Sequence, residues 1–148
     1  MTDLSTFEEL VALDHGLSVV VTLRPDGTPH ATVVNAGVTA HPVTGDRVVA
    51  FVVAGATRKL AHLRAEPTTA VVVRAGWRWA TVEGRAELIG PDDPRPEVDG
   101  EGLRVLLRDI FSAAGGTHDD WDAFDRAMRE ERRTAVLVTP TRTYSNPG

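Results

Sequence analysis

The chain has 148 residues, a formal net charge of −5 and no cysteine. The lack of cysteine excludes disulfides, thiolate catalysis and cysteine-ligated metals, and the acidic balance argues against a nucleic-acid-binding protein. The sequence has no run of eighteen apolar residues, and its acidic N-terminus lacks the apolar core of an export signal. We therefore expect one cytoplasmic domain, residues 1–148, with no membrane or nucleic-acid partner.

The first third of the chain predicts a short helix and three strands. Ser5 and Glu8 have the spacing of a capping box at the start of the helix. Alternating apolar residues predict strands over 17–24 and 28–36, joined by a tight turn. In the first of these strands, the residues predicted to face the core are Leu17, Val19, Val21 and Leu23. The third strand, 48–53, has no polar face, so it belongs in a barrel or beneath a second layer.

On the second of these strands, His30, Thr32 and Val34 share one face. A histidine and a threonine on that face can contact a ligand, or solvent can cover them. The residues taken alone favour the second interpretation.

The segment 55–67 predicts a short helix between two buried strands. Thr57 is a suitable N-cap, and Pro67 ends the helix. Arg58 and Lys59, the one lysine of the sequence, occupy its first turn, where the helix dipole is already positive and a cation costs roughly 0.3–1 kcal/mol. Free amide donors, a hydroxyl and two cations suit a phosphate group. A solvated helix start in an arginine-rich chain explains the same residues equally well.

Two further strands are predicted over 69–73 and 77–89. The polar face of the second strand begins with Trp77 and Trp79. Large exposed aromatic side chains mark a partner surface or a ligand site. Packing in a dimer explains these tryptophans at least as well as ligand binding, and the two interpretations agree if the ligand lies between two subunits.

The last third of the chain predicts a loop, two helices and a final strand. The loop is 90–102, and a 3.6-residue apolar repeat predicts a helix over 103–114. Thr117 is the predicted cap of the next helix, and the apolar stripe of this helix, Trp121, Phe124 and Met128, favours a place in the core over a ligand-binding surface. The final strand, 134–139, ends at Pro140. The six strands, joined mainly by short turns, predict a mainly β fold, an antiparallel barrel with peripheral helices.

The sequence lacks the usual catalytic and metal-binding patterns. It has no G-x-S-x-G nucleophile elbow, no H-E-x-x-H, no phosphate loop of the nucleotide hydrolases and no G-x-G-x-x-G. The five histidines are isolated, so no metal site and no catalytic residue are predicted. A chain with a predicted anion site and aromatic residues, but without an identifiable nucleophile or base, suits a cofactor that carries the chemistry itself.

Four segments, in this order and at this spacing, carry a resemblance to a known superfamily: residues 23–29, 58–67, 77–88 and 118–133. With them, the whole chain resembles the flavin and deazaflavin oxidoreductases with a split β-barrel, which include pyridoxamine 5′-phosphate oxidase. The sequence is most similar to the branch that binds the deazaflavin coenzyme F420.

The resemblance implies a homodimer of six-stranded split β-barrels, with a cofactor in each of two grooves between the subunits. It also implies an F420-dependent oxidoreductase that transfers a hydride between the coenzyme and a small conjugated acceptor. Two alternatives remain: an FMN-dependent oxidoreductase of the same fold, and a coenzyme-binding protein without catalysis.

The resemblance further implies which residues bind the cofactor. Lys59 contacts the phosphate, and Thr57 and Arg58 lie beside it. The other implied contacts are Val52 and Val53 along the cofactor, His30 and Thr32 facing the ring, and Trp77, Arg78 and Trp79 from the other subunit. Some relatives carry an arginine two places before the lysine, where this sequence has Thr57.

Overall fold

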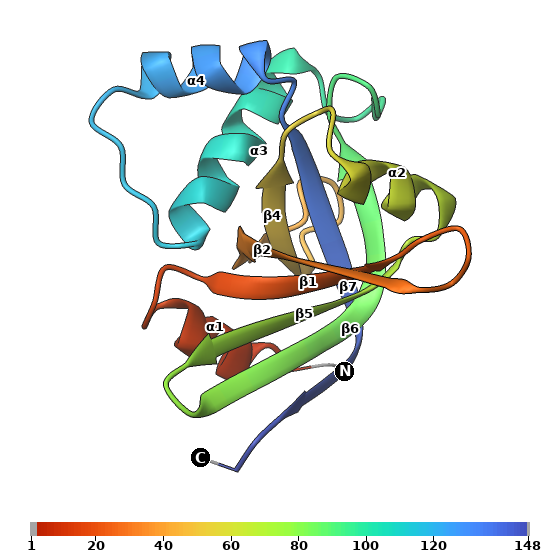
Figure 1. The fold of residues 1–148 in the computed structure, drawn as a ribbon. Coiled ribbons are helices and arrows are strands. Elements are labelled where there is room, and N and C mark those ends of the chain that lie inside the picture. The colour runs from red at the N-terminus through yellow and green to blue at the C-terminus, as the bar shows by residue number, and fades with distance from the viewer. Residues whose placement is uncertain (1–2, 148) are drawn as a thin grey trace.

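The computed structural model describes residues 3–147, in which β-strands form the framework and helices lie at its margins (Figure 1). In chain order the elements are α1 (Ser5–Val11), β1 (Leu17–Leu23), β2 (Pro29–Asn35), β3 (Gly37–Ala40), β4 (Arg47–Val53), α2 (Arg58–Ala65), β5 (Thr68–Ala75), β6 (Arg78–Ile89), α3 (Gly100–Ala113), α4 (Trp121–Glu130) and β7 (Thr134–Ser145). The predicted mainly β architecture with peripheral helices is confirmed.

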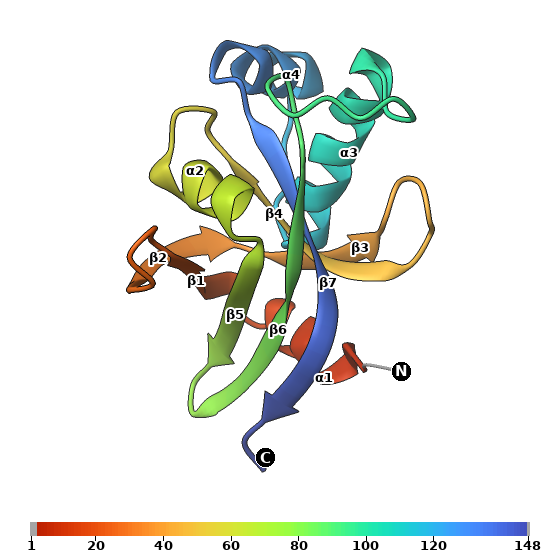
Figure 2. The same cartoon turned by 90° about the vertical axis from the view of Figure 1, so that its right-hand side faces the viewer.

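Within this range the strands form one seven-stranded sheet in the order β2-β1-β5-β6-β7-β4-β3. Every neighbouring pair is antiparallel. The two longest strands, β6 and β7, run side by side through the molecule (Figure 2). They join the part of the sheet built from β1, β2 and β5 to the part built from β3 and β4.

The predicted number of six strands is wrong, because the structure has the additional strand β3. This strand has four residues, too few for an alternating pattern to be recognised in the sequence. It begins at Gly37, where a Cβ atom would lie 2.5 Å from the backbone carbon of Ala113 on α3. Glycine therefore allows the close approach between β3 and α3.

The predicted end of the last strand at Pro140 is also wrong, because β7 continues to Ser145. Pro140 pairs with Gly84 of β6, next to a shift of register between Glu83 and Gly84. A bulge accommodates a residue that has no N–H to donate. At Gly84 a Cβ atom would overlap the carbonyl oxygen of Thr139, so the two strands approach closely at this point.

The hydrophobic core has two parts that meet at β4. One part lies beneath α1 and α2 and includes Phe51 and Leu60. The other lies beneath α3 and α4 and includes Val48 and Ile110. Residues 48–51 are all buried, which confirms that this strand has two apolar faces and lies between layers.

The predicted core face of β1 is wrong. The buried side chains are Ser18, Val20 and Thr22, whereas Leu17 is 43% exposed and Val19 is 39% exposed. The buried polar groups have partners: Ser18 donates to the carbonyl of Gly16, and the hydroxyl of Thr22 lies 2.9 Å from Nδ1 of His62 on α2. Helix α2 therefore covers the face that alternation assigned to solvent, and an apolar face of β1 remains uncovered in the single chain.

Two predicted helix caps are also wrong. Helix α1 begins at Ser5 itself, whose N–H donates to the carboxylate of Asp3 at 2.8 Å. Helix α4 is capped by Asp120, which accepts a hydrogen bond from the N–H of Ala123, and Thr117 precedes this cap. The N-cap position of α1 is Leu4, which has no capping side chain, whereas at α4 an aspartate caps as well as a hydroxyl residue would.

His41 fixes the turn between β3 and β4. Its Nδ1 accepts hydrogen bonds from the N–H groups of Val43 at 3.1 Å and Thr44 at 3.2 Å, and its Nε2 lies 2.8 Å from Oε1 of Glu87. These contacts require an Nδ1 without a proton. Burial lowers the pKa of His41, and the nearby Arg95 guanidinium lowers it further.

We expect the free energy of unfolding to fall as the pH falls below 6.5, the ordinary pKa of histidine. Between the lowered folded pKa and 6.5, the unfolded chain binds the proton more readily than the folded chain, so stability declines with decreasing pH. Urea unfolding from neutral to mildly acidic pH measures this slope. In His41→Ala the stability should be lower at neutral pH and the slope smaller, and an unchanged slope would remove His41 as its source.

Candidate functional site

A cleft of about 830 Å³ is lined by residues of β2, β4, α3 and α4. The strands contribute Val33, Val34, Asn35, Val52 and Val53 to its lining. The helices contribute Ile110, Phe111, Phe124, Ala127 and Met128. The polar residues of the lining include Thr57, Lys59, His15, His118 and Arg133. Its volume and its apolar walls with a few polar groups are typical of small-molecule sites.

Lys59 is half-buried in the first turn of α2, at the wall of this cleft. Its Nζ donates a hydrogen bond to the hydroxyl of Thr32 on β2 at 2.7 Å. Among the described residues, no ion pair includes Lys59. Burial lowers the pKa of Lys59. A desolvated ammonium without a carboxylate partner is a favourable position for an anion.

Thr57 occupies the predicted N-cap position, but its hydroxyl does not cap the helix. The hydroxyl instead donates to the carbonyl oxygen of Ala54 at 3.0 Å. The oxygen of Thr57 therefore keeps acceptor capacity, and no side chain within residues 3–147 caps the first turn of α2. Arg58 is exposed and is not part of the cleft lining.

His30 and Thr32 of β2, which were predicted to face the ring of the cofactor, contact residues of α2. Thr32 accepts the hydrogen bond from Lys59, and the ring of His30 packs edge-on against His62, with 5.0 Å between the ring centroids. The Nδ1 atom of His30 is buried and has no hydrogen-bond partner among the described residues. Burial lowers the pKa of His30, as do the charges of Arg24 and other nearby cations. Neither His30 nor Thr32 belongs to the cleft lining of a single chain.

The tryptophan segment lies away from the cleft of its own chain. Trp77, in the turn between β5 and β6, is 94% exposed. Arg78 donates to Oε1 of Glu9 at 2.7 Å, and Trp79 packs edge-on against Tyr144. Figure 1 places the β5–β6 turn at the opposite end of the molecule from α4. The predicted contact of this segment with a cofactor therefore requires a second chain.

Arg133 is a lining residue that the sequence analysis did not select. It lies in the short connection between α4 and β7. Its Nε atom is buried and has no hydrogen-bond partner among residues 3–147, while its Nη2 donates to Oε1 of Glu131 at 3.0 Å. Its proximity to the cleft results from the pairing of β4 with β7, which the sequence does not show.

The helical end of the cleft contains a histidine among aromatic rings. The ring of His118 lies 5.7 Å from that of Phe124 and 6.3 Å from that of Phe111. Its Nδ1 accepts a hydrogen bond from the N–H of Asp120 at 3.0 Å, so the neutral ring carries its proton on Nε2. Aromatic faces of this kind suit a flat conjugated molecule.

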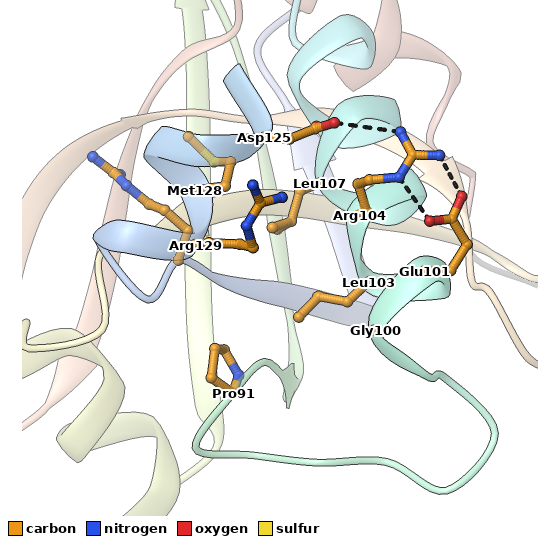
Figure 3. A pocket seen from close by; sticks show the side chains of 10 residues that line it. Pro91, Gly100, Glu101, Leu103, Arg104, Leu107, Asp125, Met128 and Arg129 are labelled. Atoms are coloured by element: carbon orange, nitrogen blue, oxygen red, sulfur yellow. Dashed lines mark hydrogen bonds and ion pairs between the residues drawn. The ribbon is translucent and has the colours of Figure 1, made fainter. Parts of the chain in front are cut away.

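A smaller pocket of about 290 Å³ lies between α3 and α4 and shares Met128 and Arg133 with the cleft. Figure 3 shows Arg104 hydrogen-bonded to Glu101 and Asp125 at this pocket. Arg108 also donates to Asp125, at 2.5 and 2.9 Å. Because most of these charges are paired within the chain, the larger cleft is the better candidate for a charged ligand.

Residues 3–147 contain no group of three or more histidines, cysteines, aspartates or glutamates that could hold a metal ion. In the same range, no helix combines the length and the apolar character that a membrane crossing needs.

Comparisons with known proteins bear on the fold of the chain. Among solved structures, a conserved hypothetical protein from Mycobacterium tuberculosis, Rv2991, is 19% identical and has a TM-score of 0.68, and the match covers 98% of this chain and 84% of that one. An F420 reductase is 20% identical with a TM-score of 0.61 and coverage of 92% and 94%. An FMN-binding protein related to pyridoxamine 5′-phosphate oxidase, from Nostoc punctiforme, is 12% identical with a TM-score of 0.60 and coverage of 96% and 79%.

At these identities the three structures show a common fold, which confirms the predicted split barrel. The family comparison covers nearly the whole described chain, because residues 6–146 match the family of pyridoxamine 5′-phosphate oxidase. The chain therefore belongs to the pyridoxamine 5′-phosphate oxidase family.

Proposed function

We propose that the protein is an oxidoreductase that binds coenzyme F420 in the cleft beside Lys59 and acts on a small conjugated acceptor. The observation that carries this proposal is the half-buried ammonium of Lys59, which faces a cleft of about 830 Å³ without a carboxylate partner among residues 3–147. A phosphate of the coenzyme would supply the missing negative charge.

The residues of the cleft fit a phosphorylated flavin or deazaflavin. Lys59, Thr57 and Arg133 contribute two cations and a hydroxyl to the lining, and Val52 and Val53 supply an apolar surface along β4. When bound, such a coenzyme supplies the hydride chemistry itself. The contribution of this chain is to hold the phosphate, orient the ring against the apolar wall and exclude water from it.

The choice of F420 over FMN rests on the sequence resemblance and on the F420 reductase among the similar structures. The FMN-binding protein from Nostoc punctiforme supports the alternative. A protein that is yellow when purified, with flavin bound, would favour FMN.

We further propose that the functional unit is a homodimer. Leu17 and Val19 of β1 are 43% and 39% exposed, and Val33 of β2, which pairs with Val19, is 65% exposed. Contiguous apolar side chains on an uncovered sheet face are typical of protein interfaces. Because Val33 also lines the cleft, a second copy seated on this face would complete the wall of the cofactor site.

A turnover assay tests the proposed activity. The purified protein is mixed with reduced F420 and a panel of quinones, enones and nitroaromatic compounds, and the absorbance of the coenzyme is followed. We expect oxidation of the coenzyme that depends on both the protein and an acceptor. Tight binding without turnover across the panel would favour the alternative of a coenzyme-binding protein, and the absence of binding would contradict both.

A further inference from the structure

The segment that contains Arg133 is hydrogen-bonded to the segment that leads into Thr57 and Lys59. Strand β4 pairs with β7 up to Val53 and Thr134, so Arg133 adjoins the connection that leads into α2. The N–H of Gly55 in this connection donates to the carbonyl of Glu131 at 3.0 Å. A Cβ atom at Gly55 would lie 2.7 Å from the carbonyl oxygen of Arg132, so the two segments are in close contact.

The hydrogen-bonding capacity of Arg133 is only partly used. Its Nη2 donates to Glu131, whose side chain is 43% exposed, and such exposed pairs are weak. Its Nε is buried and has no hydrogen-bond partner among the described residues. A buried N–H without a partner is costly unless a ligand or water accepts from it.

The neighbouring arginines are not part of the cleft lining. Arg58 is exposed and lies outside the lining, although it is adjacent to Lys59 in the sequence. Arg132 is bonded to Asp92, at 2.5 Å from Nη2 and 3.3 Å from Nε. Arg129 lines the smaller pocket but not the cleft.

We propose that Arg133, and not Arg58, supplies the guanidinium that binds the ligand's phosphate together with Lys59. This inference rests on the proposed function, because it assigns a further binding residue to the same cleft. A guanidinium offers planar paired donors to phosphate oxygens, whereas the lysine offers a point charge. The phosphate is thus held between two cations from distant parts of the sequence, one on α2 and one immediately before β7.

The first test uses inorganic phosphate and the unmodified protein. In a ¹H–¹⁵N spectrum of arginine Nε–Hε groups, the signal missing from Arg133→Lys identifies Arg133. We expect this signal to shift in a saturable way as phosphate replaces chloride at constant ionic strength, while the signals of Arg58 and Arg129 stay in place. A stationary Arg133 signal would overturn the inference. This readout does not depend on a variant binding its ligand.

The second test compares FMN with riboflavin, and F420 with its chromophore lacking the phosphate, by fluorescence titration. Arg133→Ala and Arg133→Gln, which keeps a polar side chain without the charge, should weaken binding of the phosphorylated member of each pair by roughly 10- to 100-fold. The affinity for the other member should change by no more than about twofold. Arg58→Ala and the control Arg129→Ala should change neither. Equal losses for both members, or a loss in Arg58→Ala alone, would contradict the role of Arg133.

The two tests separate this inference from the proposed function. If the unmodified protein binds none of the four compounds, the proposed function fails, and the phosphate titration alone decides the role of Arg133. If the compounds bind but Arg133 does not distinguish the phosphorylated ones, the proposed function stands and the inference fails.

Discussion

Lys59→Ala is expected to weaken the binding of phosphorylated coenzyme by roughly 10- to 100-fold, the range for a lost hydrogen bond to a charged group. The ammonium is half-buried, is held by Thr32 at 2.7 Å and has no carboxylate partner among residues 3–147, so its charge is available to a ligand. Fluorescence titration with F420 and with FMN measures the loss. Unchanged affinity for both coenzymes would remove Lys59 from the phosphate site.

Lys59→Arg is the matched control, because it keeps the charge over a wider pH range. Burial lowers the pKa of Lys59 below its ordinary value of 10.5, so the ammonium loses its proton as the pH rises toward that value. Coenzyme affinity of the unmodified protein should decline across this window, whereas the affinity of Lys59→Arg should stay level. Parallel pH profiles for the two proteins would exclude Lys59 as the titrating group.

Val19→Asp is expected to dissociate the homodimer. In the single chain the side chain of Val19 is 39% exposed on the outer face of β1. A carboxylate there would be buried without a partner when a second copy covers the face, which costs roughly 3–5 kcal/mol. Val19 does not line the cleft, so a loss of coenzyme binding in this variant would report the loss of the second subunit.

Val105→Asp is the control for this substitution. Val105 lies on α3 and is 42% exposed, so the same charge is introduced at a similar exposure but away from the β1–β2 face. Sedimentation velocity should show a dimer for the unmodified protein and for Val105→Asp, and a monomer for Val19→Asp. A monomeric unmodified protein, or a dimeric Val19→Asp, would contradict the proposed interface.

Some features of the fold depend on the local sequence pattern alone. The strand 48–53 could be predicted as buried on both faces because its composition leaves no polar side, and the structure buries residues 48–51 completely. Lys59 stood out because a cation in the first turn of a helix is locally unfavourable, although the same residues fit a solvated helix start equally well. The structure places Lys59 at the cleft, and its contact with a phosphate stays a prediction.

Other features depend on contacts between distant segments. Strand β1 carries apolar residues on both faces, and its buried face is set by α2, whose His62 contacts Thr22. Arg133 could not be selected from its neighbours, because it reaches the cleft only through the pairing of β4 with β7. The contact of Trp77 with a cofactor stays a prediction, since it depends on a second chain.

The most direct measurement is a titration of the purified, unmodified protein with F420 and FMN, followed by coenzyme fluorescence and by protein–ligand stoichiometry. Occupation of the cleft beside Lys59 predicts saturable binding of one coenzyme per chain, with F420 bound more tightly than FMN and each bound more tightly than its form without phosphate. Failure of both coenzymes to bind, or equal affinity with and without the phosphate, would contradict the claim that the cleft beside Lys59 binds a phosphorylated coenzyme.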